Sequence, residues 1–306
     1  MLSYLQAAVI GLLQGVTELF PVSSLGHSVL VPALIGGDWQ TLVTQSSSRS
    51  SESSPYLAFI VALHVATALA LLVYFRSDWI RIIKAFLNTL RTRRIETSAE
   101  RLAWLIVVAT IPVGIMGLAL EHTFRTLFAK PLAAAIFLTI NGFILLGGER
   151  LRRRSEKRAE LALAGPARGR VGALVVTEHR TLDKLVYREA GVIGLFQTFA
   201  LLAGISRSGI TMVAGLLRGL DHEDAARFAF LLATPVILAA GVFKLPSLAG
   251  SAGNHIRGQV LVGAVVAGVA AYLSTRFLVR FFRTQTLRPF AIYCLAMGVF
   301  CIVRFA

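Results

Sequence analysis

Long apolar runs alternate with short polar stretches along the whole chain. Six of these runs have close to the roughly 20 residues that cross the hydrocarbon core of a bilayer. They cover residues 56–75, 102–120, 131–148, 226–244, 258–280 and 287–304. Ten-residue segments of alternating apolar and polar positions, which would predict an outer-membrane barrel, do not occur. The pattern therefore predicts an all-α polytopic membrane protein with about six transmembrane helices.

A further apolar stretch, residues 4–34, is interrupted by polar and helix-ending residues. Residues 4–20 predict a helix that Pro21 ends or kinks. Ser23 or Ser24 can then cap a second short helix that runs to the end of the stretch. Because neither piece is long enough to cross a bilayer comfortably, we predict a re-entrant helix pair.

A second broken stretch, residues 189–219, can be laid on the first. Gln14 matches Gln197 and Ser23 matches Ser206, and both pairs lie 183 residues apart. Paired discontinuous helices in the two halves of a membrane protein are typical of internal structural repeats. We therefore predict a second re-entrant helix pair here.

Basic residues between the apolar runs set the orientation. Cytoplasmic loops carry an excess of lysine and arginine, and residues 76–101 and 149–188 hold many of them, whereas residues 121–130 are poorer in charge. With the basic loops inside, the first broken element has both ends outward and the second has both ends inward. This predicts an inverted-topology repeat within a single membrane domain, 1–306. The divisions are repeat one at about 1–148, a basic cytoplasmic loop at about 149–188 and repeat two at about 189–306.

Composition agrees with a membrane protein and argues against nucleic-acid binding. Hydrophobic residues make up 56% of the 306 residues and charged residues only 15%, against about a quarter charged in soluble domains. The net charge of +15 fits basic loops held against anionic lipid, and the basic residues lack the footprint of a nucleic-acid site. The N-terminus lacks the basic segment and cleavage site of a removed signal peptide.

Glu18 stands inside an apolar helix, where an ionised side chain is costly unless it faces a polar cavity or a partner. Gln14 precedes it by one helical turn on the same face. Hard divalent cations prefer carboxylate and amide oxygens, so this pair is a candidate metal site. The alternative is a carboxylate that only hydrogen-bonds a neighbouring helix. Function is favoured because two serines and His27 follow closely.

Ser23, Ser24 and His27 lie at the start of the second half-helix. The spacings i, i+3 and i, i+4 let either hydroxyl meet the imidazole. A serine beside a histidine can be a nucleophile with its base, or a hydroxyl partner to a general acid. Helix capping explains one serine without any catalysis. These residues leave open whether Ser24 forms a covalent intermediate or His27 activates water.

Arg207 is the sharpest signal in the second broken element. A guanidinium in the first turn of a half-helix joins the free backbone N–H groups and the positive end of the helix dipole in an anion site. Its two-pronged geometry suits phosphate. The alternative is an ion pair with Glu18 that only holds the two broken elements together. The candidate substrate-binding residues are Ser23, Ser206, Arg207, Ser208, Gly209 and Thr211.

Two other polar residues, His64 and Asn141, occur singly in predicted spanning helices. Isolated polar side chains in membrane helices often hydrogen-bond a neighbouring helix. We predict that structural role for both residues.

The two polar segments resemble the signatures of a known family, the undecaprenyl-diphosphate phosphatases of the bacitracin-resistance type (BacA/UppP-like). Residues 14–27, QGVTELFPVSSLGH, resemble its first signature, (E/Q)GxTEFLPVSSxGH, and residues 203–211, AGISRSGIT, resemble its second, PGxSRSGxT. Ala203 replaces the proline of the second signature, and the insertions at 45–54 and roughly 152–180 are unlike compact members. The spans between the two signatures fit the whole length of the family.

The resemblance implies removal of the terminal phosphate from undecaprenyl diphosphate, which recycles the lipid carrier for peptidoglycan synthesis and confers bacitracin resistance. It also implies a multi-pass protein of the bacterial plasma membrane whose site opens toward the outer face. By the same resemblance, Gln14 and Glu18 engage a divalent cation, with Mg²⁺ expected first and Ca²⁺ as the alternative. The implied catalytic residues are Glu18, Ser24, His27 and Arg207.

The rival function is a transporter or flippase of a prenyl phosphate lipid, because inverted repeats with broken helices are common in secondary carriers. A non-catalytic scaffold would leave the costly intramembrane Glu18, His27 and Arg207 unexplained. The expected partners are a prenyl diphosphate lipid and membrane lipids. The sequence leaves open the identity of the metal, the chain-length preference and the choice between monomer and homodimer.

Overall fold

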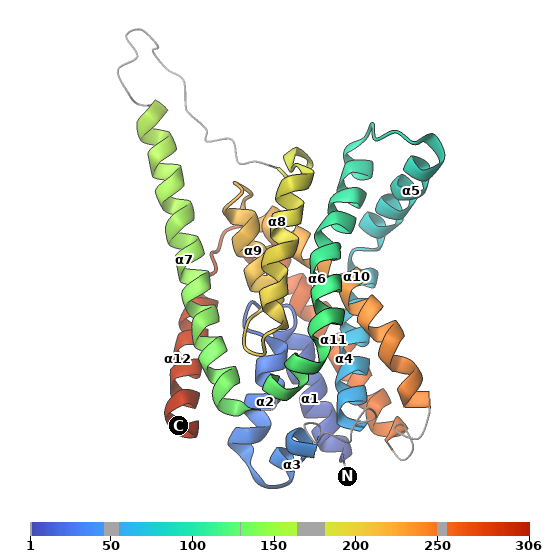
Figure 1. The fold of residues 1–306 in the computed structure, drawn as a ribbon, viewed down its shortest axis with the longest axis vertical. Coiled ribbons are helices and arrows are strands. Elements are labelled where there is room, and N and C mark those ends of the chain that lie inside the picture. Colours follow the sequence, from blue (N-terminus) through green and yellow to red (C-terminus); the bar gives the residue numbers. More distant parts are fainter. Residues whose placement is uncertain (1, 46–54, 129, 164–180, 250–255) are drawn as a thin grey trace.

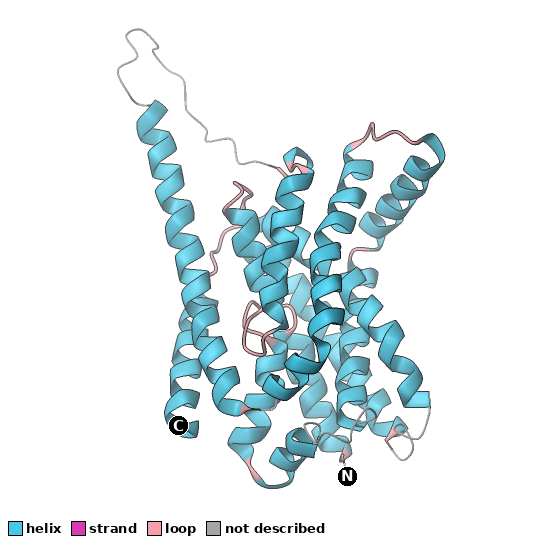
Figure 2. Ribbon diagram, viewed as in Figure 1, coloured by secondary structure: helices cyan, strands magenta, loops and turns pink. Residues whose placement is uncertain are grey.

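A computed structural model describes residues 2–45, 55–128, 130–163, 181–249 and 256–306, and these residues are mostly helical (Figure 1). No strand occurs in these ranges (Figure 2). The serine-rich segment 46–54 and the second part of the basic insertion, 164–180, lie outside the described residues. The α-helices are α1 Tyr4–Thr17, α2 Ser24–Ile35, α3 Gly37–Gln45, α4 Pro55–Tyr74, α5 Arg76–Thr92, α6 Ser98–Phe128, α7 Pro131–Leu163, α8 Tyr187–Gln197, α9 Arg207–Leu216, α10 His222–Ala249, α11 Arg257–Phe281 and α12 Arg288–Phe305, with short 3₁₀ helices at Leu182–Lys184 and Thr198–Leu201.

Five helices in the described part of the chain, α6, α7, α10, α11 and α12, are long and apolar enough to cross a bilayer. A sixth span is added when α4 and α5, which meet at an 87° bend, are counted as one broken span. All six apolar runs of the sequence therefore form helices. The prediction of an all-α polytopic membrane protein is confirmed.

The basic segments are more helical than predicted. Residues 76–101 were expected to form a loop, but they begin with α5, whose Ile82 is buried. Phe86 of α5 packs against Trp104 of α6 with ring centroids 5.3 Å apart. Helix α7 likewise continues beyond the predicted end at 148, because the arginine- and glutamate-rich sequence that follows contains good helix formers.

The two broken elements enter the bundle from opposite ends and meet near its middle (Figure 1). Helix α1 starts at the end that carries the N-terminus and α2 returns to it, whereas α8 and α9 make the same excursion from the other end. The connecting loops touch, because the Gly204 N–H donates to Ser23 Oγ at 3.1 Å. A Cβ added to Gly26 would lie 2.9 Å from Gly204 Cα, so only a residue without a side chain fits there. This is the opposed entry that the charge pattern predicts.

Small residues let each first half-helix pack tightly on a spanning helix. A Cβ on Gly11 of α1 would lie 2.4 Å from the Gly263 oxygen of α11. A Cβ on Gly194 of α8, the matching position 183 residues later, would lie 2.3 Å from the Ala109 oxygen of α6. Close backbone approach at small residues is a common mode of helix packing in membranes. Each half-helix is thereby held by a helix of the other predicted repeat.

Candidate active site

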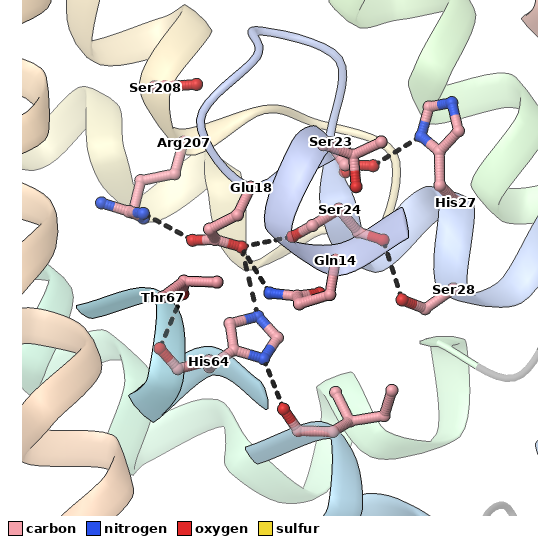
Figure 3. Close-up of polar contacts among 12 residues, drawn as sticks. Gln14, Glu18, Ser23, Ser24, His27, Ser28, His64, Thr67, Arg207 and Ser208 are labelled. Carbon is pink, nitrogen blue, oxygen red and sulfur yellow. Dashed lines mark hydrogen bonds and ion pairs between the residues drawn. The ribbon is translucent and has the colours of Figure 1, made fainter. Parts of the chain in front are cut away.

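The carboxylate of Glu18, directly after α1, is the centre of a polar cluster (Figure 3). Its Oε1 accepts a hydrogen bond from Arg207 Nη2 at 2.6 Å. Its Oε2 accepts from Ser24 Oγ at 2.5 Å and from Gln14 Nε2 at 3.0 Å. His64 Nε2, from α4, lies 3.3 Å from the same Oε2 atom. We call these five residues the Glu18 cluster; it joins both broken elements and one spanning helix.

Ser23 shapes the turn that brings Ser24 to Glu18. Its φ angle of +69° is uncommon for a residue with a side chain, and it is stabilised by two hydrogen bonds. Ser23 Oγ accepts from the Gly26 N–H at 3.2 Å, which is the predicted N-cap of α2, and from the Gly204 N–H at 3.1 Å. Ser24 is therefore the first residue of α2, with its hydroxyl on the carboxylate.

Ser206 places Arg207 in the same way. Its Oγ accepts from the Gly209 N–H at 3.2 Å and caps α9, so that Arg207 is the first helical residue. Ser208 Oγ donates to the Phe20 carbonyl of the first loop at 3.3 Å. Of the six residues predicted to bind the substrate, Ser23 and Ser208 thus link the two loops, and Arg207 is the one that reaches Glu18.

Asn141 of α7 ties the two loops together from the side. Its Nδ2 donates to the Pro21 carbonyl at 3.0 Å, and its Oδ1 accepts from the Ser206 N–H at 3.0 Å. The structural role predicted for Asn141 is therefore confirmed, with backbone groups of both loops as its partners.

Three buried polar atoms at this site have no hydrogen-bond partner within the described residues. They are Gln14 Oε1, Arg207 Nη1 and Thr211 Oγ1, and Thr211 follows Arg207 by one turn of α9. A buried polar group without a partner costs about 1–3 kcal/mol. These atoms therefore offer unused donors and acceptors to a ligand, and Arg207 Nη1 in particular suits a phosphoryl oxygen.

His27 points away from the Glu18 cluster (Figure 3). Its Nδ1 donates to the Ser23 carbonyl at 2.7 Å, and its Nε2 pairs with the Tyr293 hydroxyl of α12 at 2.8 Å. Among the described residues, neither serine hydroxyl bonds to the imidazole. The geometry pairs the Ser24 hydroxyl with a carboxylate instead, and a catalytic role for His27 stays a prediction.

The donor set fits a divalent cation that is shared with a substrate. In the described part of the chain, no group of three or more His, Cys, Asp or Glu side chains can hold a metal alone. Mg²⁺, however, is commonly held by one or two carboxylates together with substrate phosphates. The unpaired Gln14 Oε1 and the carboxylate of Glu18, one turn apart, provide suitable oxygens.

Two residues that the sequence did not predict at the site, His64 and Tyr293, contact residues that it did predict. His64 does make the predicted interhelical bond, but its partner is Glu18. Tyr293 was not singled out at all, although its hydroxyl contacts His27. An ionisable residue inside a spanning helix is a general sign of function, so His64 carried a usable signal. Tyrosine in an apolar helix carries no comparable signal.

Comparison with known proteins identifies the same family as the resemblance of residues 14–27 and 203–211. Residues 7–300 match the family described as bacitracin resistance protein BacA. The chain is 71% identical to undecaprenyl-diphosphatase 2 of Frankia alni, over 100% of this chain and 98% of that protein. It is 59% identical to the undecaprenyl-diphosphatase of Mycolicibacterium paratuberculosis (97% and 95% covered) and 46% identical to that of Acidiphilium cryptum (97% and 96% covered).

Proposed function

The chain belongs to the BacA family and is an undecaprenyl-diphosphatase, and we propose that Ser24 is its nucleophile and Glu18 the base that activates it. The enzyme hydrolyses undecaprenyl diphosphate to undecaprenyl phosphate and inorganic phosphate, which recycles the lipid carrier for peptidoglycan synthesis. The observation that carries the proposed roles is the 2.5 Å hydrogen bond from Ser24 Oγ to Glu18 Oε2. A hydroxyl that donates to a buried carboxylate is arranged for deprotonation.

The first half of the reaction transfers the phosphoryl group. Glu18 takes the proton of the Ser24 hydroxyl, and the Ser24 oxygen attacks the terminal phosphorus. The bond between that phosphorus and the bridging oxygen breaks, and undecaprenyl phosphate departs with the proton from Glu18. A phosphoserine remains at Ser24.

The second half restores the enzyme. Water attacks the phosphoserine while Glu18 takes one of the water protons. The bond between phosphorus and the Ser24 oxygen breaks, inorganic phosphate leaves, and Glu18 returns the proton to Ser24. His27 takes no proton in either half.

Arg207 neutralises the phosphoryl oxygens. Its Nη2 stays on Glu18 at 2.6 Å, while the unpaired Nη1 is available to a non-bridging oxygen. The N-termini of α2 and α9, which begin at Ser24 and Arg207, add further positive potential for an anion. Phosphoryl transfer depends mainly on such positioning and charge neutralisation.

We propose that the site also binds a divalent cation, most simply Mg²⁺. Gln14 and Glu18 would hold it, and it would neutralise charge on the diphosphate. The unpaired and buried Gln14 Oε1 supports this assignment.

We also infer that the site opens toward the outer face of the membrane. The basic helix α5 and the arginine-rich end of α7 lie at the end of the bundle opposite to the N-terminus (Figure 1). The positive-inside rule makes that end cytoplasmic, so α1 and α2 enter from outside.

Rapid quenching of the purified enzyme tests the nucleophile. A short-chain prenyl diphosphate labelled in its terminal phosphate is mixed with enzyme and Mg²⁺, and the protein is denatured within milliseconds. We expect label on Ser24 in the wild type and none in Ser24→Ala. Turnover by Ser24→Ala at a near-normal rate would overturn the assignment.

A further inference from the structure

His64 approaches the Glu18 cluster from α4, a different element from the two loops. Its Nε2 lies 3.3 Å from Glu18 Oε2, and its Nδ1 lies 2.8 Å from the Ile60 carbonyl one turn earlier (Figure 3). The ring is therefore fixed at both nitrogens. Its side chain is 24% exposed and that of Glu18 only 5%.

The partners of the ring determine which way the hydrogen bonds run. A main-chain carbonyl only accepts, so Nδ1 donates to Ile60. Glu18 faces the Arg207 guanidinium and the Ser24 and Gln14 donors, which is the environment of an ionised carboxylate, and such a group also only accepts. The Nε2 atom that faces Glu18 is therefore a donor as well.

The two carboxylate oxygens are then held from two sides. Arg207, from the second broken element, holds Oε1, and His64, from α4, holds Oε2. Oε2 is also the atom that receives the Ser24 hydroxyl. Without His64, Oε2 keeps only donors from its own broken element, Gln14 Nε2 and Ser24 Oγ. The carboxylate then loses its link to α4 and can shift toward Arg207, which misaligns the proton acceptor. Misplacement of a reacting group by about 1 Å can cost on the order of 100-fold in rate.

We propose that His64 is a positioning residue that donates to Glu18 Oε2 and holds it in line with the Ser24 hydroxyl. This inference rests on the proposed function of Glu18 as the base. It gives His64 an effect on the chemical step and none on the capture of the phosphate, because Arg207 Nη1 and Thr211 Oγ1 make no hydrogen bond to it in the structure.

The test compares His64→Leu, which removes the donor, with His64→Gln, whose amide can donate to the same oxygen. We expect His64→Leu to lower kcat by about 10- to 100-fold with KM within about twofold, and His64→Gln to recover kcat to within about threefold of wild type. The rate of phosphoserine formation after rapid quenching should fall and recover in parallel. Thr67→Val controls for disturbance of α4, because among the described residues the Thr67 hydroxyl bonds only the His64 carbonyl of the same helix.

Three outcomes would overturn the proposal. They are a folded His64→Leu variant with wild-type kcat, equal loss in the two His64 variants, and a rise in KM with kcat unchanged. Failure of the proposed function would look different, because Glu18→Gln and Ser24→Ala would then retain turnover whatever the His64 variants do.

Discussion

The two broken elements, α1–α2 and α8–α9, share a framework but not their chemistry. In both, a capping serine starts the second half-helix, as Ser23 and Ser206 do. In both, a buried glutamine stands near the end of the first half-helix. At the reactive positions, 183 residues apart, Glu18 corresponds to Leu201 and Ser24 to Arg207.

This difference separates what the fold requires from what the reaction requires. Caps occur in both elements because each broken helix must satisfy its free N–H groups inside the bilayer, and glycines occur in both because each first half-helix packs closely on a spanning helix. The acid and the nucleophile occur once and the guanidinium once, so a complete site forms only where the two tips meet. Four sets of variants test whether the two elements divide these roles, and the largest expected effect comes first.

Loss of the Ser24 hydroxyl should have the largest effect. Ser24→Ala removes the proposed nucleophile, and we expect phosphate release to fall at least about a thousandfold, because nucleophile deletions are severe. The matched control is Ser28→Ala, one turn later on α2, whose hydroxyl donates to the Ser24 carbonyl and to no other group in the described part of the chain. Phosphate release in detergent measures both, and a similar loss in both variants would point to a damaged α2.

Loss of the Arg207 guanidinium should have the next largest effect. Arg207→Ala should lower phosphate release by at least about a hundredfold, near 3 kcal/mol of transition-state stabilisation. Arg227→Ala is the control. It breaks an ion pair of the same length, 2.6 Å between Arg227 Nη2 of α10 and Asp78 Oδ1 of α5, which is not part of the Glu18 cluster. Near-normal turnover in Arg207→Ala would show that Arg207 only holds the two broken elements together through its ion pair with Glu18.

The two capping serines should differ in stability. Ser23 Oγ accepts from two backbone N–H groups, one of them in the other element. Ser206 Oγ accepts from one backbone N–H, and its link to the other element is a long 3.5 Å bond to the Phe20 carbonyl. We expect Ser206→Ala to cost about 1 kcal/mol and Ser23→Ala about 2 kcal/mol, because a second buried donor is left unpaired. Unfolding titrations in detergent measure both, and equal losses would argue against a structural tie through Ser23.

Replacement of the two buried glutamines should have the smallest effect of the four tests. It compares a proposed cation ligand, Gln14, with the glutamine at the matching position of the second element, Gln197. Gln14→Leu should lower activity about tenfold and raise the Mg²⁺ concentration needed for half-maximal activity, because Gln14 is a proposed cation ligand. Gln197→Leu should leave both quantities unchanged, because Gln14 Nε2 hydrogen-bonds Glu18, whereas Gln197 is not part of the Glu18 cluster. An Mg²⁺ dependence that is the same in Gln14→Leu and in the wild type would remove Gln14 from the proposed cation site.

The sequence predicted the structure correctly where it depends on interactions between residues a few positions apart. A serine cap at Ser23 or Ser24 and the position of Arg207 in the first turn of a half-helix were predicted from residue type and spacing over a few positions. The segments around 76–101 and 149–163 were misjudged, because charge indicates the side of the membrane and not whether a basic segment is helical. The expected contact between a serine hydroxyl and His27 is absent among the described residues, since spacing on one helix allows a contact without requiring it.

The membrane class, the two interruptions and the polar residues of the candidate site could be predicted from the sequence, because burial in lipid constrains apolar length and polar placement residue by residue. Which of those residues contact one another depends on the packing of the helices. Glu18 and Arg207 are 189 positions apart, and His27 and Tyr293 are 266. Contacts at such separation depend on how whole helices pack, and the position of His64 against Glu18 follows from the packing of α4 beside α1 rather than from any short motif.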